Sequence, residues 1–183
     1  MDVHKELFLM QQAYATLFSL TNKIQIVGDK YLEGVTSRQY MTMIAMGHLE
    51  ENERTINNIA KKLGTTKQSV KQLLNIIEKK GYIITEPSVS DKRAVNIKFT
   101  EAGIQVILKC GEMGIYLFAD LFKDFSSNEI ETLWVLLKKL YHFDGEEQDG
   151  FEDEGIDLGE DSSELQKKLL KEFERRRNLK KES

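Results

Sequence analysis

Residues 55–100 constrain the fold more than any other stretch, because short apolar stripes and turn residues follow one another there in a fixed order. Ile56, Ile59 and Leu63 recur at the spacing of an amphipathic helix. Gly64 follows at the point where a helix that ends needs a left-handed residue. The pattern predicts a short helix with one buried face, followed by a tight turn.

A second helix is predicted directly after this turn. Thr65 is placed to cap its start, with Gln68 three residues later as the partner in a capping box, and Gly81 marks its end. Its expected buried residues are Val70, Leu73, Leu74 and Ile77. Its free face is polar and basic: Thr66, Lys67, Gln68, Lys71, Gln72 and Asn75. Two short helices joined in this way are typical of a helix-turn-helix.

A hairpin is expected after the two helices. Residues 82–85 are rich in β-branched and aromatic side chains, and residues 94–99 alternate apolar and polar positions, so both stretches predict strands. The intervening residues 86–93 are rich in turn formers and include the single proline of the chain. A helix-turn-helix followed by a hairpin with a basic tip is a winged helix.

Charge is segregated along the chain, whose formal net charge is −4. Residues 55–100 hold nine basic and three acidic side chains, whereas residues 144–161 hold ten acidic and no basic ones. Residues 162–183 are basic again, with eight basic and four acidic side chains. The positive excess coincides with the predicted winged helix, where a polyanion such as DNA would dock.

The wing and the residues after it carry the most specific motif: Ser90-Asp91-Lys92-Arg93-Ala94, a strand, and then Phe99-Thr100-Glu101-Ala102-Gly103. On these residues the chain resembles the MarR (multiple antibiotic resistance regulator) family over roughly residues 5–143. The resemblance implies that Asp91 orients Arg93, which enters the DNA minor groove. It also implies a homodimer and, since most of the family are repressors, repression of transcription.

The flanking segments predict further helices, at about 5–28, 37–50, 100–122 and from 126 onward. Thr36, Thr100 and Ser126 are placed to cap the last three, and the helix at 37–50 is expected to support the helix-turn-helix from behind. Residues 5–28 carry more apolar surface than a helix on a small domain needs, which leaves a core helix or an intersubunit helix as alternatives. The resemblance favours the second. We therefore expect a mostly α fold with a β-hairpin wing: a dimerisation region at 1–34 and 100–143, a DNA-binding winged helix-turn-helix at 35–99, and an atypical extension at 144–183.

The extension combines the acidic run with a predicted basic helix from Ser163. Three roles remain open: a solvated appendage, an acidic segment that competes with DNA for the winged helix, or a basic helix that adds DNA or subunit contacts. If the second holds, truncation after Phe143 should tighten DNA binding at low salt.

Side chains for the DNA contact follow from the winged helix and the resemblance together. Glutamine can pair with adenine, lysine with guanine or phosphate, and a wing arginine suits a narrow minor groove. The expected DNA-binding residues are Thr65, Thr66, Lys67, Gln68, Ser69, Lys71, Gln72, Ser90, Asp91, Lys92 and Arg93. A dimer would read a pseudo-palindromic operator. The resemblance also implies a small aromatic effector, for which Phe8, Tyr14, Tyr40, Met41 and Phe118 are the candidate contacts.

Other classes of protein are disfavoured. No apolar run approaches the ~18 residues of a membrane span, no signal peptide is evident, and the single Cys110 predicts a reducing cytoplasm. The three histidines lack the spacing of a metal site, and no nucleophile motif or phosphate loop is present, so neither an enzyme nor a cofactor is expected. The remaining alternative is a winged helix that contacts proteins, with the acidic tail as its partner-binding arm.

Overall fold

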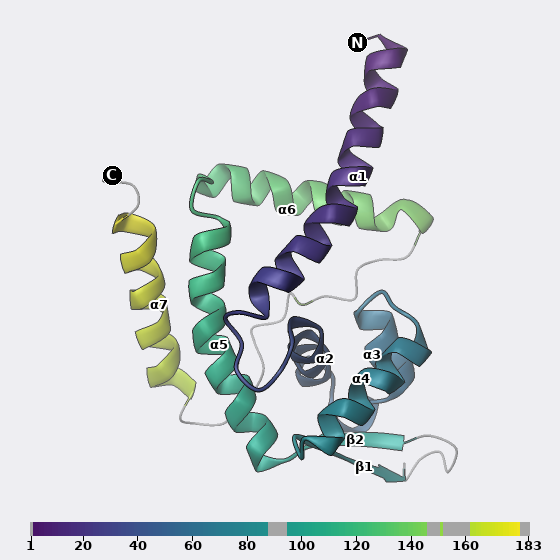
Figure 1. Ribbon diagram of the computed structural model, residues 1–183, viewed down its shortest axis with the longest axis vertical. Helices are drawn as coiled ribbons and strands as arrows, with labels where there is room; N and C mark the ends of the chain where they lie inside the picture. Colours follow the sequence, from purple (N-terminus) through teal and green to yellow (C-terminus); the bar gives the residue numbers. More distant parts are fainter. Residues whose placement is uncertain (1, 88–94, 146–150, 152–161, 180–183) are drawn as a thin grey trace.

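The winged helix and its flanking helices are described by a computed structural model covering residues 2–87, 95–145, 151 and 162–179 (Figure 1). The helices are α1 (Val3–Gly28), α2 (Ser37–Gly47), α3 (Ile56–Lys62), α4 (Lys67–Lys79), α5 (Glu101–Leu121), α6 (Ser127–Tyr141) and α7 (Ser162–Leu179), with 3-10 turns η1 (Glu51–Glu53) and η2 (His142–Asp144). Strands β1 (Ile83–Pro87) and β2 (Val95–Phe99) pair antiparallel, with Ile83 opposite Phe99. The predicted fold class, mostly helical with a hairpin wing, is confirmed.

Capping side chains fix most of the helix starts where the sequence predicts them. The Thr36 hydroxyl accepts from the Gln39 backbone N–H at 3.3 Å, and Ser126 makes the same contact with Glu129 at 3.3 Å. Each is half of a complete capping box, because the third residue of the helix accepts in return from the cap backbone.

The start of α4 differs from the prediction by one residue. Thr66, not Thr65, is the cap, and its hydroxyl accepts from the Ser69 N–H at 3.2 Å. The reason lies in the end of α3: Gly64 has a φ of +57°, and the Thr65 N–H donates back to the Ala60 carbonyl at 3.0 Å. Thr65 therefore still belongs to the closing turn of α3, and α4 begins after it.

The core gathers around α2, which packs behind the helix-turn-helix as expected. Met43 and Met46 are fully buried on this helix. Around them lie the buried aliphatic side chains of the other elements: Ile59, Val70, Leu74, Ile77, Ile83 and Ile97. Met41, on the same helix, is 40% exposed. The helix also ends earlier than predicted, since Arg54 Nε donates to the carbonyls of Met46 and Leu49 at its C-terminal end.

The junction between the wing and α5 explains the Thr-x-x-Gly motif. Thr100 caps α5 by accepting from the Gly103 N–H at 3.1 Å, and its hydroxyl donates to the Gly81 carbonyl at 2.6 Å. A Cβ on Gly103 would lie 2.0 Å from the Tyr82 carbonyl oxygen. Only glycine allows the first turn of α5 to approach Tyr82, between α4 and β1, so closely.

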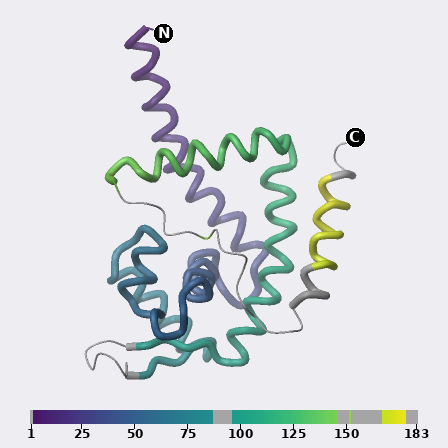
Figure 2. The backbone as a smooth tube through the Cα atoms, turned by 180° about the vertical axis from the view of Figure 1, so that it is seen from behind, coloured from purple at the N-terminus to yellow at the C-terminus, as the bar shows by residue number. Residues whose placement is uncertain are grey.

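The long helices α1, α5 and α6 lie beyond the winged helix. In both views the N-terminal half of α1 projects away from the rest of the chain, while α6 crosses the upper part of the molecule (Figures 1 and 2). Among the described residues, α5 is the one helix whose length and mean hydropathy of 1.3 would suffice for a membrane span. It contacts α2, β2 and α7, and its buried side chains, which include Ile107 and Ala119, face the rest of the chain.

Helix α7 runs beside α5 (Figures 1 and 2). The Arg176 guanidinium stacks over the Tyr116 ring, 3.6 Å from its centroid. Arg177 donates to the Phe122 carbonyl and, at 2.8 Å, to the Phe125 carbonyl. These carbonyls lie at the corner between α5 and α6, so the described arginines of the basic helix are engaged within the chain.

Candidate nucleic-acid interface

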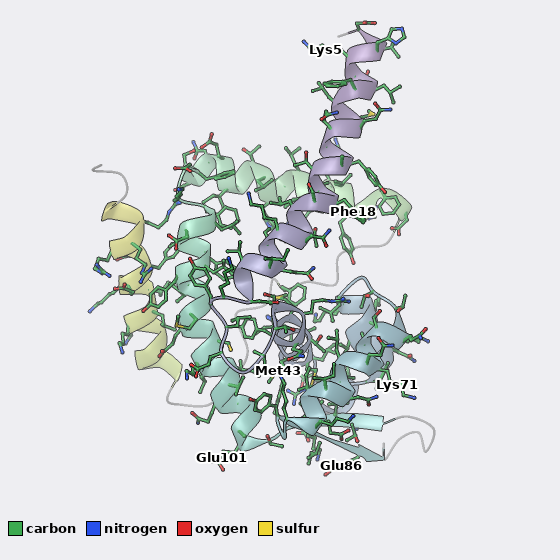
Figure 3. The ribbon with its side chains drawn as sticks, viewed as in Figure 1. Lys5, Phe18, Met43, Lys71, Glu86 and Glu101 are labelled. Atoms are coloured by element: carbon green, nitrogen blue, oxygen red, sulfur yellow. The ribbon has the colours of Figure 1, made fainter. Side chains whose placement is uncertain are left out.

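The outer face of α4 carries the side chains expected to read DNA. Lys67 and Lys71 are exposed one helical turn apart, and so are Gln68 and Gln72. Figure 3 shows Lys71 on the side of the helix-turn-helix that points away from α5 and α6. Thr65, before the helix, and Ser69, in its first turn, are half-buried. The structure thus places the seven candidates at the turn before α4 and along the first two turns of α4: Thr65, Thr66, Lys67, Gln68, Ser69, Lys71 and Gln72.

The basic residues of this region divide into two groups. Lys61, Lys67, Lys71 and Lys79 are exposed on α3 and α4. The others that the structure describes serve internal contacts. Lys62 is buried, and Lys80 Nζ donates to the Gly34 carbonyl at 2.7 Å and to Gln39 at 2.8 Å. The cationic surface is therefore narrower than the sequence count suggests.

The base of the wing is fixed by polar contacts. Glu78 on α4 accepts from the Thr85 N–H at 3.0 Å and from the Thr85 hydroxyl at 2.7 Å, and these two bonds connect β1 to α4. Lys98 on β2 forms ion pairs with Glu51 at 3.0 Å and Glu86 at 3.2 Å. Hydrogen bonds to these two carboxylates raise the pKa of Lys98. The wing-tip candidates Ser90, Asp91, Lys92 and Arg93 lie outside the described residues.

The turn between α3 and α4 lies against the end of α6. A Cβ built on Gly64 would lie 3.1 Å from the Tyr141 hydroxyl. Beside this contact is a cleft of about 470 Å³ between α1, α2, the α3–α4 turn and α6. Its lining includes Ile24, Arg38, Met41, Tyr141 and Phe151. The cleft therefore lies between the helical region and the helix-turn-helix.

The five candidate effector contacts do not gather around this cleft. Met41 lines it, whereas Phe8, Tyr14 and Phe118 are more than half exposed on α1 and α5. Tyr40 packs against the core, where burial raises its pKa to about 12. The lining residues that sequence reasoning missed include Tyr141 and Phe151. For Phe151 the sequence did contain a signal, because an aromatic residue stands alone there within an acidic, glycine-containing stretch.

Cys110 and the histidines offer no further site among the described residues. Cys110 is buried, and burial raises the pKa of its thiol. Within residues 2–87, 95–145, 151 and 162–179, no group of three or more His, Cys, Asp or Glu side chains could hold a metal ion. His48 instead packs its ring against Phe151.

A known family matches the part of the chain that spans the helix-turn-helix. Residues 33–94, from the loop before α2 into the wing, match the model of the MarR family. Residues 33–94 form a MarR family domain. The match includes all the candidate residues on α4 and at the wing tip, so both parts of the expected interface belong to the MarR domain.

Solved structures of MarR regulators share the fold of the chain beyond this domain. The chain is 27% identical to S. aureus MepR in a DNA complex, with a TM-score of 0.64 over 70% of this chain and 96% of that one. A mutant E. coli MarR complexed with operator DNA gives 23% identity, a TM-score of 0.63, and coverage of 76% and 99%. The organohalide-sensing regulator RdhR in its 2,4-dichlorophenol-bound form is 19% identical to the chain, with a TM-score of 0.67 over 78% of this chain and 85% of that one. The chain thus has the fold of MarR transcription regulators.

Proposed function

We propose that this chain is a homodimeric, sequence-specific DNA-binding regulator of transcription, with residues 35–99 as the DNA-binding domain. The observation that carries the proposal is the face of α4, where Lys67, Gln68, Lys71 and Gln72 form an exposed row at the outer side of a MarR family domain. Its similarity to MepR, which was solved as a DNA complex, supports the same function.

Each part of the interface has a distinct role in this proposal. Gln68 and Gln72 read adenine edges in the major groove, and Lys67 and Lys71 contact guanine or phosphate. Thr65, Thr66 and Ser69 lie at the start of α4, where hydroxyl groups contact the DNA beside them. On the wing, Arg93 enters the minor groove, Asp91 holds it in place, and Ser90 and Lys92 contact the backbone.

Dimerisation through residues 1–34 and 100–143 is supported by apolar surface that one chain leaves uncovered. Large hydrophobic side chains are more than half exposed on α1, including Leu7, Phe8 and Phe18, and on α6, including Val135 and Leu136. Phe18 projects sideways from α1 in Figure 3. A contiguous face of this kind marks an interface, and a second copy would cover it with its own α1 and α6. The two recognition helices would then lie ~34 Å apart on a pseudo-palindromic operator.

Repression, and release by a small aromatic effector, complete the proposal. A bound dimer would exclude other proteins from its operator. An effector that entered the cleft at Met41 would contact both the helical region and the α3–α4 turn, because both line that cleft. A change in their relative position alters the distance between the two recognition helices and thus the fit to the operator.

Selection of bound duplexes from a random pool tests this function. Enrichment of a near-palindrome with half-sites about one DNA turn apart is expected. On a selected duplex, Lys71→Gln should weaken binding and reduce the salt slope by about one phosphate equivalent. Lys30→Gln is the matched control, since Lys30 is also exposed but follows α1, away from α4. Negligible affinity with no salt dependence would contradict the proposal and favour a protein-binding winged helix.

A further inference from the structure

Phe151 is a described residue of the extension, and it lies against the MarR family domain. Its ring meets that of His48 edge to face, with centroids 5.5 Å apart. The Lys62 ammonium lies over the same ring, 5.7 Å from the centroid. Phe151 is half-buried and packs against the main hydrophobic core. A side chain held by an aromatic edge, a cation and the core has a defined binding site.

The walls of that site suit an aromatic group with acidic neighbours. Met41 and Leu73 supply apolar surface, and Tyr141 closes one side. Arg38 and Lys62 bring two cationic side chains to the same cleft. In the sequence, Phe151 is preceded by Asp149 and followed by Glu152, Asp153 and Glu154, which lie outside the described residues. The apolar and cationic side chains that line the cleft therefore suit an aromatic residue that has acidic neighbours in the sequence.

We propose that this cleft is a binding site for an aromatic side chain within an acidic peptide, and that Phe151 of the same chain is its resident ligand. This inference rests on the DNA-binding function proposed above. By binding at the cleft, Phe151 keeps the acidic stretch of the chain within reach of the start of α4. It thereby lowers the affinity of the chain for DNA.

The length of the connection favours a ligand from the same chain. Tyr141 at the end of α6 lines the cleft, and η2 ends at Asp144, seven positions before Phe151. Seven residues span at most about 25 Å, so Phe151 remains tethered close to the cleft. A short tether gives an effective concentration on the order of millimolar, which a separate peptide would have to exceed.

The acidic neighbours set the effect on DNA. Glu152 to Glu154 follow Phe151 by one to three positions, so their Cα atoms stay within roughly 11 Å of it. Thr65, which also lines the cleft, precedes Lys67 on α4 by two residues. One negative charge about 10 Å from a phosphate or a phosphate-binding lysine changes affinity about twofold in water. Several such charges, partly screened by salt, lower affinity about three- to tenfold.

Histidine signals in an NMR spectrum of the full chain test the contact itself. The chain has three histidines, His4, His48 and His142, so their ring signals can be assigned. Phe151→Ala should shift the His48 signals and leave those of His4 in place, because the ring current of Phe151 is lost. Phe143→Ala is the matched control: Phe143 is 82% exposed and adjacent to His142. An unchanged His48 signal in Phe151→Ala overturns the site.

Binding to a random-sequence duplex at about 50 mM salt tests the consequence. Phe151→Ala should bind three- to tenfold more tightly than the wild type, and Phe143→Ala should match the wild type once both are shown to have its oligomeric state. The gain should vanish at about 300 mM salt, where surface charges are screened. Equal or weaker binding by Phe151→Ala overturns the inference. Absence of binding by every variant would instead contradict the DNA-binding function, while the His48 signal still reports on the cleft.

Discussion

Replacing Gly103 with alanine should destabilise the protein, although alanine is the better helix former. Gly103 lies in the first turn of α5, and its added Cβ would lie 2.0 Å from the Tyr82 oxygen and 2.9 Å from its carbonyl carbon. These atoms belong to the backbone, so a rotamer change cannot relieve the overlap. The first turn of α5 must retreat by about 1 Å.

That retreat loosens a set of hydrogen bonds. The Thr100 N–H donates to the Tyr82 carbonyl at 3.0 Å, and the Thr100 hydroxyl donates to the Gly81 carbonyl at 2.6 Å. The weaker hydrogen bonds and the steric overlap together should lower the free energy of unfolding by about 2–4 kcal/mol. The helix propensity of alanine returns about 1 kcal/mol, which leaves a net loss of about 1–3 kcal/mol.

Gly111→Ala is the matched control within the same helix. Its Cβ would meet only the Tyr40 hydroxyl, at an ordinary 3.8 Å, so this variant should gain up to about 1 kcal/mol. Urea unfolding followed by circular dichroism, at matched protein concentrations, measures both free energies of unfolding. If Gly103→Ala proved as stable as Gly111→Ala, the close approach of α5 to Tyr82 would be refuted.

Three further predictions concern α7 and the subunit interface. Hydrogen bonds from Arg175 and Arg176 lower the pKa of Glu172 to about 2. The stabilisation of α7 by Glu172 is therefore complete above pH 4.5 and is lost as the pH falls toward 2. Pepsin cleavage of α7 should rise over that interval in the wild type but not in Glu172→Gln. Arg177→Met removes the donor to two backbone carbonyls, which should loosen α7 by about 1.5–3 kcal/mol and speed its amide hydrogen exchange; unchanged exchange would contradict the role of Arg177. Phe18→Glu places a charge on the exposed apolar face of α1 and should yield monomers in sedimentation equilibrium, and a persistent dimer would exclude this face as the interface.

Local signals in the sequence predicted the winged helix well. Thr36, Thr100 and Ser126 cap helices as expected, because a cap depends on a few adjacent residues. The left-handed turns at Gly64 and Gly81 follow from the same kind of short-range signal. The shift of the α4 cap to Thr66 shows its limit, since two adjacent threonines compete and the end of α3 decides between them.

Features that depend on distant parts of the chain were not predictable. Lys62 carries a charge and was counted with the DNA-facing surface, yet it is buried, and Phe151 from the extension lies against it. Lys98 likewise joins Glu51 and Glu86. No spacing in the sequence reveals these contacts, because residues far apart in the chain make them. The five effector candidates were chosen as aromatic or methionine side chains and not by location, and of these only Met41 lines the cleft beside the α3–α4 turn.

The bonds from Arg177 to the α5–α6 corner bear on how shortened versions of this protein will behave. Cutting the chain after Phe143 discards α7 as well as Phe151, and two carbonyl groups and the Tyr116 ring lose the groups that shield them. Such a fragment lacks these contacts at the α5–α6 corner as well as the charged residues of the extension. A higher DNA affinity of the fragment could come from either loss, whereas the point substitutions test each one separately.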